Sequence, residues 1–121
     1  MDEEISNAKI TGTKLGFDDH GFFTFSIAVD GDGFGCNLGG YALSCYDKAT
    51  LKRKGSEYGL NVIMRILEVV GVEHWEDLEG KYVRVTHNGP GSTMHTLGNI
   101  IKDDWIDFRT YREGLEDGNE G

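Results

Sequence analysis

Several residue types and patterns are scarce in this 121-residue sequence, which has one proline and two cysteines. No apolar run approaches the roughly 20 residues that a membrane-spanning helix requires. The acidic start has no apolar signal core, so we expect no secretion. Cys36 and Cys45 match no metal-ligand spacing and have no histidine at ligand distance in the sequence. We therefore expect two free thiols in a reducing cytoplasm rather than a disulfide.

Catalytic motifs are also missing. The sequence contains no GxSxG elbow, HExxH pair, Walker loop or CxxC pair. His87 and His95 could face each other across a hairpin as a metal or acid–base pair, or they could simply be two polar strand positions. We therefore predict no catalytic residue, no metal site and no cofactor.

The net charge of −9 is concentrated at the two ends of the chain. Residues 1–4 hold three acids, and residues 103–121 hold seven acids against two arginines. The interior has eleven acids and ten bases, so it is nearly neutral. A duplex-binding protein would be more basic, and a DNA mimic would carry its acids over the folded body. We expect a single ligand-binding domain over residues 1–112 and an acidic disordered tail over residues 113–121.

The remaining pattern predicts a small α+β domain. Its 38% apolar content is sufficient for a hydrophobic core. Alternating apolar residues and turn residues predict a mainly antiparallel sheet with one principal buried helix. The expected strands are residues 5–16, 22–30, 81–87 and 93–101, with a short, bent strand or a strand pair at 34–45. Turns are expected at 17–21, 31–33 and 88–92, and an irregular segment after 101.

The helix has the clearest boundaries. Ser56 is suited to cap its start and Gly71 to end it. A further helical turn is expected at 73–80, with Trp75 and Leu78 packed inward. The spacing predicts that the buried stripe consists of Leu60, Ile63, Leu67 and Val70, widened by Met64, Ile66 and Val69.

Residues 31–56 are the most informative stretch for function. Glycines there allow a close approach of backbone to a ligand. The stretch ends in four cations just before the helix, where positive charge and free N–H groups attract phosphate. These cations are Lys48, Lys52, Arg53 and Lys54. The combination indicates a site for a small phosphorylated molecule.

A longer pattern resembles a known family. The segment GYALSCYDKATLKRKGSEYGLNVIMRILEVVGVEHWEDLEGKYVRV, followed by LGNIIKDDWIDF, is similar to the phage-encoded Thoeris anti-defence sponges of the first described type. The similarity covers residues 7–108. It depends on the order of the early hairpin, the GGYAL segment, the YGL helix, the WEDL-GKYVRV turn and strand, and the GNIIKDDW strand end.

The resemblance implies a binding protein and not an enzyme. Such sponges capture a cyclic ADP-ribose isomer made by bacterial Thoeris immunity and hold it intact in the host bacterial cytoplasm. The resemblance also implies a homodimer or a multiple of dimers, and some members bind cyclic oligonucleotides. We expect neither long nucleic acid nor a membrane as a partner.

A cyclic ADP-ribose pocket needs phosphate donors, an aromatic platform for the base and polar groups for hydroxyls. For each candidate the plain alternative is a solvated charge, a core aromatic or a turn residue. The phosphate candidates are Arg53, Arg84, Arg109 and Arg112. The stacking candidates are Tyr82, Trp105 and Phe108. The hydroxyl candidates are Asn88 and Ser92, and the candidate wall is Gly39, Gly40 and Tyr41.

Two other functions stay open at this point. One is an enzyme that degrades a cyclic nucleotide, such as a phosphodiesterase, which would need an acid–base pair or metal carboxylates. The other is a phage inhibitor that binds a host protein directly.

Overall fold

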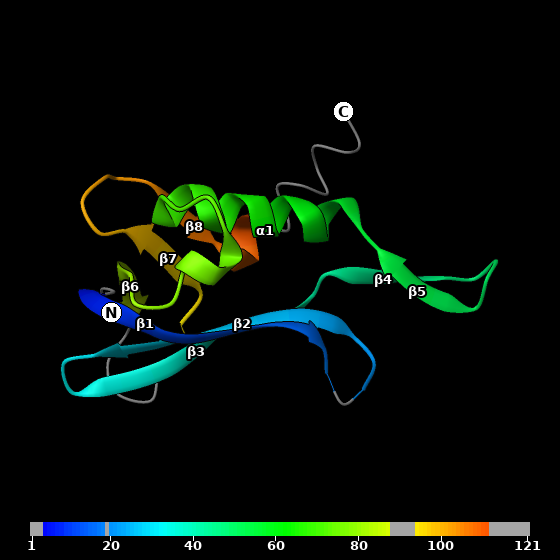
Figure 1. The fold of residues 1–121 in the computed structure, drawn as a ribbon, viewed down its shortest axis with the longest axis horizontal. Helices are drawn as coiled ribbons and strands as arrows, with labels where there is room; N and C mark the ends of the chain where they lie inside the picture. The colour runs from blue at the N-terminus through cyan, green and yellow to red at the C-terminus, as the bar shows by residue number, and fades with distance from the viewer. Residues whose placement is uncertain (1–3, 19, 88–93, 112–121) are drawn as a thin grey trace.

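A computed structural model describes residues 4–18, 20–87 and 94–111 of the chain. Their strands and helices, in chain order, are β1 (Glu4–Phe17), β2 (Phe23–Gly31), β3 (Phe34–Ala42), β4 (Ser44–Asp47), β5 (Lys52–Gly55), α1 (Glu57–Val70), the 3₁₀ turn η1 (Trp75–Asp77), β6 (Tyr82–His87), β7 (Thr96–Asn99) and β8 (Trp105–Asp107). Antiparallel strands and one long helix confirm the predicted α+β class (Figure 1). No helix within these residues is long and apolar enough to cross a bilayer.

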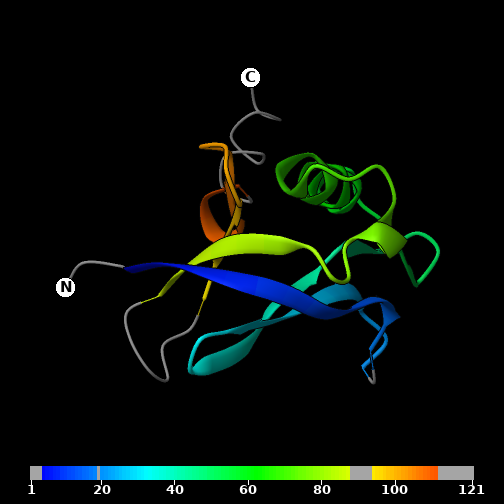
Figure 2. The same ribbon diagram turned by 60° about the vertical axis from the view of Figure 1, so that its left-hand side comes forward.

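The main sheet has six strands in the order β3-β2-β1-β6-β7-β8. Strand β1 is shared by both halves of this sheet, because its first half pairs with β6 and most of its length pairs with β2. A register shift between Ile10 and Gly12 lies where the two pairings meet. Such a bulge increases local twist and bends the strand. The sheet therefore curls instead of lying flat (Figure 2).

Within the main sheet β3, β2 and β1 form a meander, and the connection from β3 to β6 contains the β4–β5 hairpin and α1. The antiparallel pairings make β3 and β7 run in the same direction. Side chains connect them, because the Tyr41 hydroxyl and His95 Nδ1 lie 3.2 Å apart and the Cys36 thiol donates to Met94 Sδ. A fold of this kind does not by itself assign a function.

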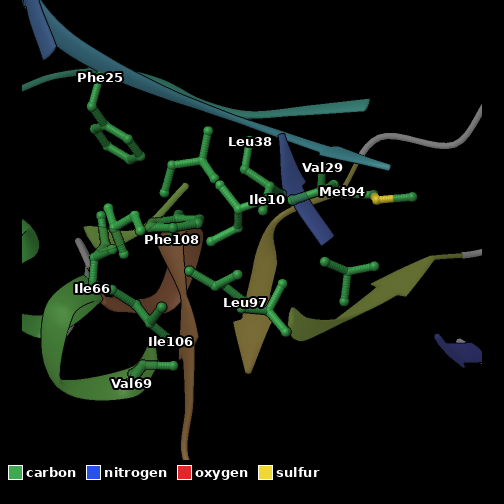
Figure 3. Close-up of a cluster of buried hydrophobic side chains, with 14 of the residues drawn as sticks. Ile10, Phe25, Val29, Leu38, Ile66, Val69, Met94, Leu97, Ile106 and Phe108 are labelled. Carbon is green, nitrogen blue, oxygen red and sulfur yellow. The ribbon is translucent and has the colours of Figure 1, made fainter. Parts of the chain in front are cut away.

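The hydrophobic core lies between the curled sheet and α1 (Figure 3). Strands β2 and β3 contribute Phe25, Val29 and Leu38 from one side. The helix contributes Ile66 and Val69 from the other. Between them lie residues from the second half of the sheet, including Leu97, Ile106 and Phe108, as the labelled side chains show.

The helix begins and ends where the sequence predicts, but its buried face differs from the predicted stripe. Ser56 Oγ accepts from the Gly59 N–H, and Gly71 ends the helix in the left-handed conformation with φ +89°. The buried positions are Gly59, Val62, Ile66 and Val69. Leu60 is 65% exposed and Met64 53% exposed, so their assignment to the stripe was wrong. Ile63, Leu67 and Val70 pack only at the flank.

A single close contact fixes this rotation of the helix. Gly59 lies against Leu43, and a Cβ at Gly59 would overlap the Leu43 carbonyl oxygen. That oxygen also accepts from the Ser56 N–H at 3.3 Å and from Ser56 Oγ at 2.9 Å. Only glycine permits such an approach, so the helix must turn its glycine toward the strand. A hydrophobic pattern ranks side chains by polarity and misses this constraint.

Other sequence expectations are met in part. Both cysteines are free thiols. Leu78 is fully buried and Trp75 packs edge-on to Phe25, as predicted. The sequence missed β5 and β8, and it made the strand at 93–101 too long, since β7 covers only Thr96–Asn99. The expected turn at 88–92 and the tail at 113–121 lie outside the described residues.

We predict that Gly59→Ala lowers the free energy of unfolding by about 1–3 kcal/mol, because the new methyl group must displace the Leu43 backbone. The cost of the overlap therefore outweighs the gain of about 1 kcal/mol that alanine brings to a helix interior in place of glycine. The control is Gly16→Ala, where an added Cβ meets nothing within 4 Å. Urea unfolding measures both variants, and a Gly59→Ala protein as stable as the parent would contradict the contact.

A candidate ligand-binding notch

Three adjoining hollows lie near the end of β1, and Phe17 lines two of them. The first has a volume of about 340 Å³, the second about 250 Å³ and the third about 660 Å³. Phe17 lines the first two, and Phe23 and Gly55 line the second and third. We call these three hollows, which share lining residues in pairs, the Phe17 notch. It brings together three stretches of sequence: the β1–β2 hairpin, the β4–β5 hairpin, and the start of α1.

The first hollow lies on the outer face of the sheet. Thr24 and Ser26 point outward there, since they alternate with the buried Phe25 and Ile27 of β2. The strand backbone is bare at Gly16, where an added Cβ meets nothing within 4 Å. The other lining residues are Lys14, Phe17, Asp18, Phe25 and Gly40. Open backbone beside hydroxyls and a lysine is suited to a flat, polar group.

The second hollow contains a positioned arginine. Arg53 Nε donates to Ser44 Oγ at 2.9 Å, and its Nη2 donates to the Ser44 carbonyl at 2.7 Å. The guanidinium carbon lies 4.3 Å from the centre of the Phe22 ring. These contacts hold the plane of the guanidinium, and its other N–H groups remain available for an anion.

Two lysines add positive charge beside Arg53. Lys52 and Lys54 are exposed neighbours on β5. No ion pair involves either of them within the described residues. The hairpin that carries them projects from the body of the protein next to the start of α1 (Figure 1). Positive charge beside a helix N-terminus favours an anion, and Glu57 in the first turn of α1 reduces that preference.

The third hollow is mainly apolar. Leu15, Phe23 and Leu43 line it from the strands and the β3–β4 connection, and Leu60 and Ile63 line it from α1. Phe17, which lines the second hollow, is 74% exposed, although it contacts Phe23 edge-on at 5.1 Å between ring centres. An exposed ring next to cations is the arrangement that stacks on a nucleobase.

The structure divides the predicted site residues into separate groups. Gly40 and Arg53 belong to the notch. Tyr82, Arg84 and Trp105 lie together elsewhere, on the outer face of β6–β8. The structure therefore does not unite the predicted site residues into one hollow. Asn88, Ser92 and Arg112 lie outside the described residues.

Arg84 holds a loop in place, and its role as a phosphate donor stays a prediction. Its Nε donates to the Asn99 carbonyl and its Nη2 to the Lys102 carbonyl, both at 2.7 Å. Its guanidinium carbon lies 4.9 Å from the centre of the Trp105 ring. The Trp105 Nε1–H donates to Asp103. The Arg84 guanidinium is therefore engaged by the 99–105 segment.

Phe108 and Tyr41 belong to the core and its border. Phe108 is fully buried, so its prediction as a stacking partner for a ligand is wrong. It packs on Phe25 and Tyr41 with ring centres 5.4 and 5.7 Å apart. Tyr41 is half-buried and reaches His95 through its hydroxyl. Sequence cannot distinguish a core aromatic from a platform, because both occur at apolar strand positions.

Arg109 lies in the helical turn at 108–111, next to Asp107. Its Nη2 is 3.3 Å from Asp107 Oδ2. Burial raises the pKa of Asp107, but hydrogen bonds and charge from Arg109 outweigh it and lower that pKa overall. Arg109 is half-exposed, so it stays a predicted ligand contact.

The two histidines do not pair with each other. His87 Nε2 lies 2.8 Å from Ser6 Oγ, and His95 Nδ1 lies near the Tyr41 hydroxyl. Within the described residues, no group of three or more His, Cys, Asp or Glu side chains could hold a metal ion.

Sequence reasoning missed most of the notch. Phe17, Phe22 and Phe23 flank the turn between β1 and β2, and three aromatics around one short turn were the available signal. Lys14 gave no signal in the sequence, because an isolated lysine on a strand is usually solvated.

No protein-family model matches the chain, and searches of curated proteins and of solved structures returned no match.

We predict that Arg84→Ala lowers the free energy of unfolding by about 1–3 kcal/mol, because it leaves two carbonyls without their charged donor. The neighbouring Lys81→Ala should change stability by less than about 0.5 kcal/mol, since Lys81 is exposed. Urea unfolding of the two variants decides the point. Equal stabilities would mean that Arg84 does not hold the 99–105 segment.

Proposed function

We propose that this protein is a phage anti-defence sponge that binds a cyclic ADP-ribose isomer at the Phe17 notch, holds it intact and so blocks Thoeris immunity in the host bacterial cytoplasm. Two independent considerations support the proposal. The sequence resembles that sponge family, and the notch offers the three kinds of group that such a ligand requires.

The fixed Arg53, next to unpaired lysines and an exposed aromatic ring, is the observation that carries the proposal. A pyrophosphate favours a planar guanidinium whose orientation is already set. Lys54 lines the same hollow and adds a second positive charge. Phe17 also lines the first hollow, where Thr24 and Ser26 offer hydroxyls to a ribose. Adenine would stack on the exposed Phe17 ring.

A homodimer is part of the proposal. The third hollow borders Leu60, which is 65% exposed, and Met64 on the same helix is 53% exposed. A second copy placed there would cover apolar surface that one copy leaves in water.

We predict that the protein removes a cyclic ADP-ribose isomer from solution and returns it unchanged after heating. The protein is incubated with each isomer and separated by filtration, and the heated supernatant is analysed by mass spectrometry. Altered ligand would indicate a cyclic-nucleotide-degrading enzyme. No uptake would point to a host protein as the target.

We expect two notch variants to weaken this capture. Phe17→Ala removes a stacking platform worth about 1–3 kcal/mol per base, which corresponds to roughly 5- to 150-fold in affinity. Arg53→Lys keeps the charge but loses the planar fork. Lys81→Ala should bind like the parent, because Lys81 lies just before β6 and does not line the notch. If Arg109→Ala abolishes capture while both notch variants bind normally, the site lies at the C-terminal turn.

A further inference from the structure

The outer face of β1 and β6 carries exposed groups that the notch does not use. Ile5 is 59% exposed and Tyr82 is 58% exposed. The Lys9 ammonium lies 5.8 Å from the centre of the Tyr82 ring. Together with Arg84 and Trp105 these residues form what we call the cation–aromatic face. Its members alternate along each strand with buried residues, so they point away from the core.

Strand register places these groups in ordered rows. Lys9 is opposite Tyr82, and the next outward pair is Asn7 opposite Arg84. The second row continues across the sheet, because Arg84 pairs with Gly98 and Gly98 pairs with Trp105. Tyr82 and Arg84 are therefore successive outward side chains of one strand, about 6.8 Å apart along it.

Contacts within the protein fix the orientation of the Arg84 guanidinium plane. Two backbone carbonyls accept from it, and Trp105 lies beneath its guanidinium. Trp105 in turn rests on bare backbone, since a Cβ at Gly98 would be 2.5 Å from a ring carbon of Trp105. A guanidinium plane and a phenol ring are both platforms on which unpaired bases stack.

We infer that the cation–aromatic face binds a short stretch of single-stranded nucleic acid. One base stacks on Tyr82 and the next on the Arg84 plane. Lys9 lies opposite Tyr82 on β1, and Lys102 lies in the loop between β7 and β8, where its carbonyl accepts from Arg84; both are exposed cations that would neutralise phosphates. The side chain of Asn7 offers hydrogen bonds to a base edge or sugar. This activity is separate from nucleotide capture in the notch.

Charge and shape favour a single strand over other partners. The net charge of −9 comes mainly from residues 1–4 and 103–121. At the cation–aromatic face the three cations Lys9, Arg84 and Lys102 lie with Asp103, whose carboxylate accepts from Trp105 Nε1. A duplex presents its charged backbone and hides its base faces, which leaves Tyr82 without a partner. A membrane would need more positive charge than a few separated cations.

The test is fluorescence anisotropy of a labelled oligothymidine of about ten nucleotides at low salt, with the full-length protein. The parent should bind, and its affinity should fall as salt rises. Tyr82→Ala should weaken binding roughly 5- to 100-fold, while Tyr82→Phe should keep most of it. Lys54→Ala, in the notch, should leave binding unchanged. Circular dichroism confirms that each variant is folded.

Several results would overturn the inference. One is no anisotropy change with the parent protein. Another is a Tyr82→Ala variant that binds the oligonucleotide like the parent. A third is a Lys54→Ala variant that loses as much affinity as Tyr82→Ala, which would place the oligonucleotide in the notch. Equal affinity for a duplex of the same length and for the single strand would show that binding is only charge attraction to phosphates. Cyclic ADP-ribose capture is measured on the same Tyr82→Ala protein and should be unaffected, so failure of one proposal is distinguishable from failure of the other.

Discussion

The backbone of Leu43 joins three parts of the molecule that would otherwise be independent. Its N–H donates to the Phe23 carbonyl at 2.7 Å, which ties the chain to β2. Its carbonyl accepts from Ser56 at the start of α1, and Gly59 lies against it. The β4–β5 hairpin begins and ends at this junction, since Ser44 pairs with Gly55. The rotation of the helix, the position of the hairpin and the shape of the Phe17 notch all depend on it.

The sequence pattern predicted the helix and strands that are stabilised by interactions between residues close together in the sequence. The first hairpin and the helix ends were found because alternation, turn residues and caps act within a few residues of one another. Strands β5 and β8 were missed because they are short. Lys52–Gly55 is all cations and glycine, and its strand conformation comes from pairing with Ser44–Asp47. Trp105–Asp107 is likewise a strand because it pairs with β7. Tertiary pairing decides such segments.

The candidate site shows the same division. The sequence pointed to the cations before α1 and to Gly40, because charge and glycine are visible in a single stretch. It could not place Phe17 beside Arg53, which lies 36 positions later, because that meeting needs the Leu43 junction. It also assigned Phe108 to a ligand, whereas Phe108 fills the core, and it did not show that Arg84 holds the 99–105 segment. Residue type alone does not separate these roles.

The central claim is that the Phe17 notch holds the captured nucleotide. Amide chemical shifts in a ¹H–¹⁵N spectrum, recorded while a cyclic ADP-ribose isomer is added, test it residue by residue. The account predicts that the amides of Gly16, Gly40 and Gly55 shift together and saturate, because all three line the notch. The amides of Tyr82 and Arg84 should stay in place. Saturating shifts confined to Tyr82, Arg84 and the 99–111 segment would contradict the account.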